Sequence, residues 1–307
     1  MSSPSETKHA DKPSAGHGLE LKKKSRKPAL IGGAALVVAA AVGAVIGVNA
    51  AGSGSTAAFG TDLKVGYLST DAAQEAVLEY VAEDIAPDYG IHVIPTGIGD
   101  PNQISQAAND GELAATIYAH KPWIEQTNAA KGWKITPAEP VFQWSYSLYS
   151  SRYGSLKDLP DGARIGILDD PANTAQALML LQGAGAITLD SAVEASKATL
   201  KDIKENPRGL KLQPIAFGTA ARSLGDLDAI ISYNFEFVAA GTPAKYRIYA
   251  PEAPQVFASQ LAIGTGYLDD PNIEKLIEAF KDPKLQDYLA TTDDPAVKDQ
   301  LAPVSRP

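Results

Sequence analysis

Residues 164–182 read RIGILDDPANTAQALMLLQ, and this stretch sets the expectation for the fold. Its first five residues are mostly apolar and predict a short strand. The strand runs directly into Asp169 and Asp170, which favour capping of a helix, and into Pro171. Proline suits the first turn of a helix, because its missing N–H has no partner there in any case. The leucine-rich remainder predicts the helix itself, so the stretch is a strand that leads straight into a helix.

The same alternation recurs along the chain. Further strands are predicted at 63–68, 91–94, 210–216 and 228–232, and further helices at 102–109, 272–281 and around residues 72–85, where Thr70 or Asp71 can act as the cap. Strands that alternate with helices predict sheets covered on both faces. About 240 residues of this pattern exceed one average domain. The expected fold class is therefore α/β, with two lobes around a cleft and a β-prone crossing at 142–149.

The amino-terminal part has a different character. Residues 1–28 hold seven basic against three acidic side chains, which leaves +4 here and −13 on the rest of the −9 total. This polar segment predicts a disordered basic leader on the cytoplasmic side. Residues 29–50 contain an uncharged apolar run of about the length that spans a bilayer. Since basic residues precede it, it predicts an inward amino terminus and an extracytoplasmic remainder, followed by a linker at 51–61.

Two interpretations of residues 29–50 remain open. The segment is either an uncleaved transmembrane anchor of a single-pass protein in the cell membrane, or a signal segment cut near Ala50. Cleavage would leave a secreted or periplasmic protein. The basic leader and the apolar run are both long for a signal peptide, which favours the anchor.

Composition excludes several classes of protein. A net charge of −9 argues against nucleic acid as a partner, because phosphate binding needs a basic surface. The sequence contains no cysteine, so disulfides, thiolate metal sites, cysteine nucleophiles and a cysteine-linked lipid are excluded. No His, Asp and Glu residues cluster at the spacing of metal ligands, and no nucleophile elbow or phosphate-binding loop occurs. We expect no metal, no cofactor and no enzymatic activity.

Several short motifs carry a resemblance to a known family. They are YAHKPWIEQ at 118–126, DPAN at 170–173, ENPRGLK at 205–211, ARSL at 221–224 and GTPA at 241–244. In this order and spacing the chain resembles the NlpA family of methionine-binding lipoproteins, over about residues 62–300.

The resemblance implies an architecture and partners. Members of the family are substrate-binding proteins of ABC importers and hold an amino acid between two α/β lobes joined by a hinge. For this chain it implies a solute-binding domain at 62–303, with lobe 1 at about 62–145 and 245–303 and lobe 2 at about 146–244. The expected partners are a small amino-acid-like ligand and an ABC permease in the membrane, and the expected state is a monomer.

The resemblance also implies site residues. Tyr118, His120, Trp123 and Trp144 fall on aromatic and histidine positions that line the family's pocket, and Asn173 begins a helix that contributes to it. Aromatic faces attract an ammonium group and bury an apolar chain, which suits an amino acid. Ordinary core packing of the aromatic residues and a purely structural histidine are the alternatives.

Two positions of the family pattern concern three further residues of this chain. Gln176 stands where the family has an arginine that holds the ligand carboxylate, and a family asparagine falls on Ser232, or on Asn234 if the register slips by two. We therefore expect weak affinity for free methionine. Either the helix amino terminus at Asn173 holds the carboxylate through free N–H groups, or the ligand lacks an exposed carboxylate. The alternative function is a membrane-anchored sensor or binding protein that keeps the fold but has lost the ligand contacts.

Overall fold

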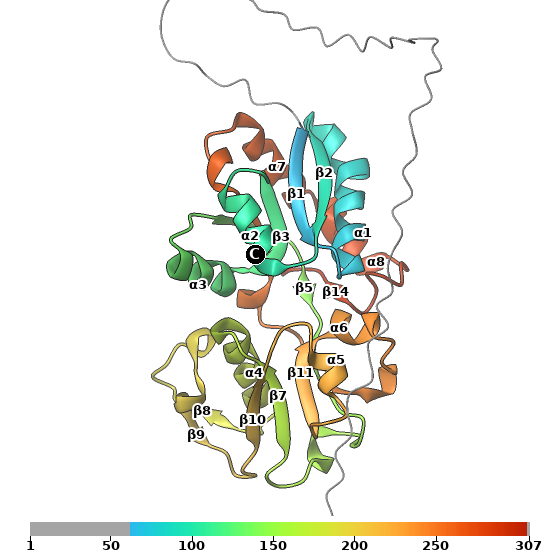
Figure 1. Cartoon of the computed structure of the whole chain (residues 1–307). Coiled ribbons are helices and arrows are strands. Elements are labelled where there is room, and N and C mark those ends of the chain that lie inside the picture. The colour runs from blue at the N-terminus through green and yellow to red at the C-terminus, as the bar shows by residue number, and fades with distance from the viewer. Residues whose placement is uncertain (1–61, 306–307) are drawn as a thin grey trace, which may run out of the picture. The chain divides into compact units, whose positions relative to one another are not determined.

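The computed structural model describes residues 62–305 (Figure 1). The predicted leader at 1–28, membrane segment at 29–50 and linker at 51–61 all lie outside these residues. None of the helices in residues 62–305 combines the length and the apolar character needed to span a bilayer.

One five-stranded sheet forms the centre of lobe 1. Its strand order is β2-β1-β3-β13-β4, in which β1 runs parallel to β2 and β3, while β13 is antiparallel to β3 and β4. The strands are β1 (Asp62–Leu68), β2 (His92–Ile98), β3 (Ala115–His120), β4 (Thr136–Pro140) and β13 (Ser259–Ile263). The α-helices of this lobe are α1 (Ala72–Tyr80), α2 (Pro101–Asn109), α3 (Lys121–Lys131), α7 (Pro271–Lys281) and α8 (Pro283–Thr291).

A second five-stranded sheet forms the centre of lobe 2. Its order is β10-β7-β11-β6-β12, with β7 parallel to β10 and β11, and β6 antiparallel to β11 and β12. The strands are β6 (Tyr146–Tyr149), β7 (Arg164–Leu168), β10 (Lys211–Ile215), β11 (Ala229–Tyr233) and β12 (Arg247–Tyr249). The helices are α4 (Pro171–Gly183), α5 (Ala220–Ser223) and α6 (Asn234–Ala239), and β8 (Thr188–Leu189) pairs with β9 (Ile203–Glu205).

The two sheets confirm the predicted α/β architecture with two lobes. β12 still pairs with β6, so the sheet of lobe 2 extends to Tyr249. Between the sheets, β5 (Gln143–Trp144) joins β4 to β6 and pairs with β14 (Leu301–Ala302) (Figure 1).

Four parallel strands lead into helices, either directly or through short polar turns. β1, β2, β3 and β7 are each followed by a helix, α1, α2, α3 and α4 respectively, whose first backbone N–H groups are capped by a side chain: Asp71, Asp100, His120 and Asp170. An open α/β sheet binds ligands outside the carboxyl ends of its strands, where such turns gather. The fold therefore places the polar caps of both lobes at the edges where a ligand is expected.

Candidate functional site

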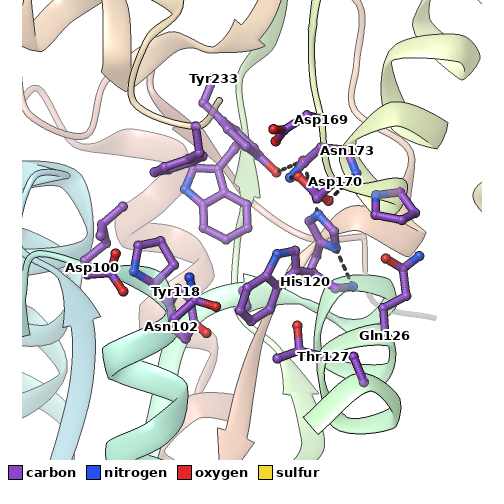
Figure 2. Close-up of a pocket in the computed structure, with 18 of the residues that line it drawn as sticks. Asp100, Asn102, Tyr118, His120, Gln126, Thr127, Asp169, Asp170, Asn173 and Tyr233 are labelled. Carbon is purple, nitrogen blue, oxygen red and sulfur yellow. Dashed lines mark hydrogen bonds between the residues drawn. The ribbon is translucent and has the colours of Figure 1, made fainter. Parts of the chain in front are cut away.

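A cavity of about 970 Å³ is lined by residues of both lobes and of the connecting strand β5. Lobe 1 contributes the ends of β1 and β3, the start of α2 and much of α3. Lobe 2 contributes the turn between β7 and α4 and the end of β11. Figure 2 shows these side chains facing one another. The volume lies at the upper end of the range of about 300–1,000 Å³ that is typical of small-molecule sites.

Aromatic rings form much of the cavity wall. Trp123 and Tyr118 of lobe 1 meet edge to face with ring centroids 5.5 Å apart, and Trp144 meets Tyr233 of lobe 2 at the same distance. Phe235 stacks on Tyr233 at 5.7 Å. Such rings bury an apolar side chain, and their faces attract a cation.

Asn173 is the centre of the polar contacts in the cavity. Its Nδ2 donates to Asp170 Oδ2 at 2.7 Å, and its Oδ1 accepts from the Tyr233 hydroxyl at 2.7 Å. Because the carboxylate of Asp170 can only accept, this pair fixes which end of the amide is nitrogen. Oδ1 also lies 3.5 Å from His120 Nε2, which belongs to lobe 1. The two lobes are thus in polar contact across the cavity (Figure 2).

His120 is held as a neutral imidazole in one tautomer. Its Nδ1 accepts the backbone N–H of Trp123 at 3.2 Å, so the ring proton lies on Nε2, which donates to Asn173 Oδ1. The side chain is almost fully buried, and this burial lowers the pKa of His120 to about 4, against the smaller opposing effect of the Asn173 hydrogen bond. A neutral histidine at this place positions Asn173 and leaves the cavity without a positive charge from the ring.

The depressed pKa of His120 predicts a specific loss of stability in acid. Between an unfolded pKa of 6.5 and a folded pKa of about 4, the unfolded chain binds a proton that the folded protein does not. Stability therefore falls as the pH drops through this window. Going from pH 7 to pH 5, the parent protein should lose about 2 kcal/mol more unfolding free energy than the His120→Asn variant. Urea unfolding at both pH values measures the difference.

The control for this experiment is His92→Asn, because the His92 side chain is 67% exposed and lies outside the cavity lining. Burial raises the pKa of Asp71 and of Glu236, and these groups make an opposite contribution. Both carboxyl groups are present in the parent and in the two variants, so their contribution to the pH dependence cancels in the comparison. An unchanged pH dependence in His120→Asn would contradict the buried neutral histidine.

Trp144 lines the cavity and is also hydrogen-bonded to the buried carboxylate of Asp71. Its Nε1 donates to Asp71 Oδ2 at 3.2 Å, and the same carboxylate accepts from Gln74 Nε2 at 2.8 Å and from the backbone N–H of Ala73 at 3.1 Å. Asp71 is 1% exposed, and burial raises its pKa. Asp71 is thus the cap of α1 and the anchor of the Trp144 ring. Of the two caps that the sequence left open, Thr70 and Asp71, the structure uses Asp71.

The structure brings together five of the eight predicted site residues. Tyr118, His120, Trp123, Trp144 and Asn173 all line the cavity. Gln176 does not: it lies one turn further along α4, its Oε1 3.4 Å from the Tyr233 hydroxyl, and lines a separate cavity of about 160 Å³. Gln176 therefore contacts the lining residue Tyr233 without lining the larger cavity itself.

Ser232 and Asn234 also lie away from the cavity. Successive residues of a strand face opposite sides, and in β11 it is Tyr233 that reaches the cavity. The Ser232 hydroxyl donates to Glu236 Oε1 at 2.9 Å. Asn234 begins α6, and its Nδ2 donates to Gln300 Oε1 at 2.8 Å, which fastens lobe 2 to the carboxyl-terminal segment.

Sequence reasoning missed several lining residues: Gln74, Asp100, Asn102, Phe217, Tyr233 and Phe235. A usable signal existed for Tyr233, because it is the last residue of a strand that ends at the cleft. Phe217 lies on a loop and carried no such signal. Among residues 62–305 no group of three or more His, Asp or Glu side chains is placed to hold a metal ion.

Comparisons with known proteins show the family and the fold of this chain. The sequence profile described as NlpA lipoprotein matches residues 63–301. The D-methionine-binding lipoprotein MetQ of Salmonella typhi is 30% identical over 247 residues, which cover 79% of this chain and 90% of the relative.

Solved structures show the same fold. A putative methionine-binding lipoprotein from Bacillus subtilis superimposes with a TM-score of 0.69 at 28% identity, covering 80% of this chain and 99% of the other. A nutrient-binding protein from Burkholderia cenocepacia bound to methionine gives 0.66 at 29% identity, covering 78% and 98%.

Proposed function

This chain belongs to the NlpA lipoprotein family, and on that basis we propose that it is an extracytoplasmic solute-binding protein of an ABC importer. Its ligand is methionine or a related amino acid, derivative or small peptide, bound between the two lobes. The relatives named for methionine binding support this solute class. The observation that carries the proposal is the aromatic cavity whose wall is built by both lobes.

The cavity favours binding over catalysis. Among residues 62–305, His120 is the one histidine that lines it, and both of its ring nitrogens are engaged, one by the backbone of α3 and one by Asn173. A general base must reach the proton that it abstracts, and this ring is instead committed to positioning other groups. We therefore propose a receptor and not an enzyme.

We also propose that the protein acts at the cell membrane. Residues 29–50 would anchor the protein, with the basic leader inside and the binding domain outside, or would act as a cleaved signal. Closure of the lobes around a solute would create the surface that a permease recognises. The domain limits proposed for the receptor are residues 62–303, in two lobes.

Tryptophan fluorescence tests the proposed site directly. The chain has three tryptophans, of which Trp123 and Trp144 line the cavity and Trp133 does not. A methionine-related solute bound there should change the fluorescence of the full chain in a saturable way. Trp123→Ala should weaken binding about tenfold, because it removes a large apolar surface from the ligand.

The matched control is Trp133→Ala, which removes the same side chain from a position outside the cavity lining. This variant should bind as the parent does. If neither methionine, its derivatives nor methionine dipeptides bind, or if both variants lose equal affinity, the proposed site is wrong.

A further inference from the structure

Three helices begin at the cavity, and a side chain of the protein caps the amino terminus of each. A free helix amino terminus binds anions through its unpaired N–H groups. Here Asp100 Oδ1 accepts from Gln103 N–H at 3.0 Å in α2, and Asp170 Oδ1 accepts from Asn173 N–H at 2.9 Å in α4. In α3 the cap is His120 Nδ1. The backbone N–H of Asn173 is thus bonded to Asp170 and is not free to hold a ligand carboxylate.

Proline reduces the number of free donors further. Each of the three helices has proline at its first or second position: Pro101, Pro122 and Pro171. Proline has no backbone N–H, so it offers nothing to an anion. The helix ends at this cavity thus present carboxylates and a neutral ring, and few N–H groups.

The charged side chains of the lining are mainly acidic. Asp100, Asp169 and Asp170 line the cavity, Lys131 is the one cation, and no arginine contributes to the lining in the described part of the chain. Lys131 is exposed and lies in the last turn of α3, where its charge complements the helix dipole. A ligand carboxylate would meet carboxylates of both lobes without a buried cation to offset them.

Asp169 is the carboxylate best placed to receive a cation. Its side chain makes no hydrogen bond or ion pair with the described residues, unlike Asp170, which is held by Asn173. Figure 2 shows Asp169 beside Asn173 and close to the Tyr233 side of the cavity. Asp169 is exposed, and a carboxylate that has no partner in the protein attracts an ammonium group, an attraction that grows as closure of the lobes excludes water.

We infer that the cavity takes an amine without a free carboxylate, such as an amino-acid amide, in preference to the zwitterionic amino acid. This inference rests on the proposed function, because it names the charge of the solute that the same cavity binds. The apolar side chain would lie against Trp123 and Trp144, and the ammonium group would lie toward Asp169.

Calorimetry with three related compounds tests the inference. L-methioninamide, L-methionine and N-acetyl-L-methionine share one side chain and differ in charge: cation, zwitterion and anion. At about pH 6.5, where an α-amino group is protonated, the full chain should bind the amide at least about tenfold more tightly than methionine. N-acetyl-L-methionine should bind most weakly.

Two variants test whether Asp169 causes the preference for the amide over methionine. Asp169→Asn should reduce the preference for the amide over methionine severalfold. Asp269→Asn is the matched control, because Asp269 is exposed and outside the cavity lining, and it should leave the preference unchanged. Methionine bound as tightly as the amide, or a preference that survives Asp169→Asn, overturns the inference but leaves the proposed receptor intact. Binding of none of the three compounds overturns both.

Discussion

Replacing Trp144 with alanine is expected to lower the free energy of unfolding by about 4 kcal/mol, the largest single effect in the site. The ring is 5% exposed and packs edge to face against Phe142 at 4.9 Å and Tyr233 at 5.5 Å. Its loss would open a void beside β5 and would also remove a hydrogen bond from the buried carboxylate of Asp71. Urea unfolding of the two proteins at neutral pH measures the difference.

Trp144→Phe separates the two causes. Phenylalanine keeps most of the packing but has no N–H, so Asp71 loses one of its three donors. Removing a partner from a buried polar group costs about 1–3 kcal/mol, and the phenylalanine variant should lose about 2 kcal/mol. A tryptophan that only fills space would give a phenylalanine variant of nearly parental stability, and this result would show that the Asp71 contact is unimportant.

Asn173→Ala is expected to lower the free energy of unfolding by about 3 kcal/mol and to loosen the contact between the lobes. The substitution leaves Asp170 Oδ2 and the Tyr233 hydroxyl without their partner, and it removes the acceptor of the His120 Nε2–H. Buried polar groups without a partner cost about 1–3 kcal/mol each, and water in the cavity would recover part of this.

Asn102→Ala is the matched control for Asn173→Ala. Asn102 also lines the cavity, but it is exposed and its side chain makes no hydrogen bond among the described residues. Its replacement should change stability by less than about 0.5 kcal/mol. Equal effects of the two substitutions would mean that Asn173 does not hold the lobes together.

The local architecture could be read from the sequence because it depends on local patterns. The strand predicted at 164–168 and the helix after it occur as β7 and α4, with Pro171 as the first helical residue. The predicted helices at 102–109 and 272–281 each begin one residue earlier, at Pro101 and Pro271. Apolar periodicity and proline at the first turn carry this information without reference to the rest of the chain.

The composition of the site depends on contacts that local patterns do not encode. His120 and Asn173 are 53 positions apart, and their proximity follows from the packing of one lobe on the other. Resemblance to the family led to five cavity residues, but it also pointed to Ser232, where the side-chain alternation of β11 turns Tyr233 to the cavity instead. A one-residue difference in a strand reverses the face on which a side chain lies.

The acidic character of the cavity lining also could not be predicted from the sequence. In the sequence Asp169 and Asp170 are interpreted as ordinary helix-capping residues, and only the fold brings them to one cavity with Asp100. The same caps occupy the helix ends that would otherwise attract a carboxylate. The departure at Gln176, which the sequence placed in direct contact with the ligand, instead lies behind Tyr233.

A crystal structure of the full chain, grown with a saturating methionine-related solute and first with L-methioninamide, would locate the bound compound. We expect electron density for it between the two lobes, with its side chain against Trp123 and Trp144 and its amine facing Asp169. Density at another surface, or an empty cavity under conditions where calorimetry shows binding, would show that the compound does not bind between the lobes.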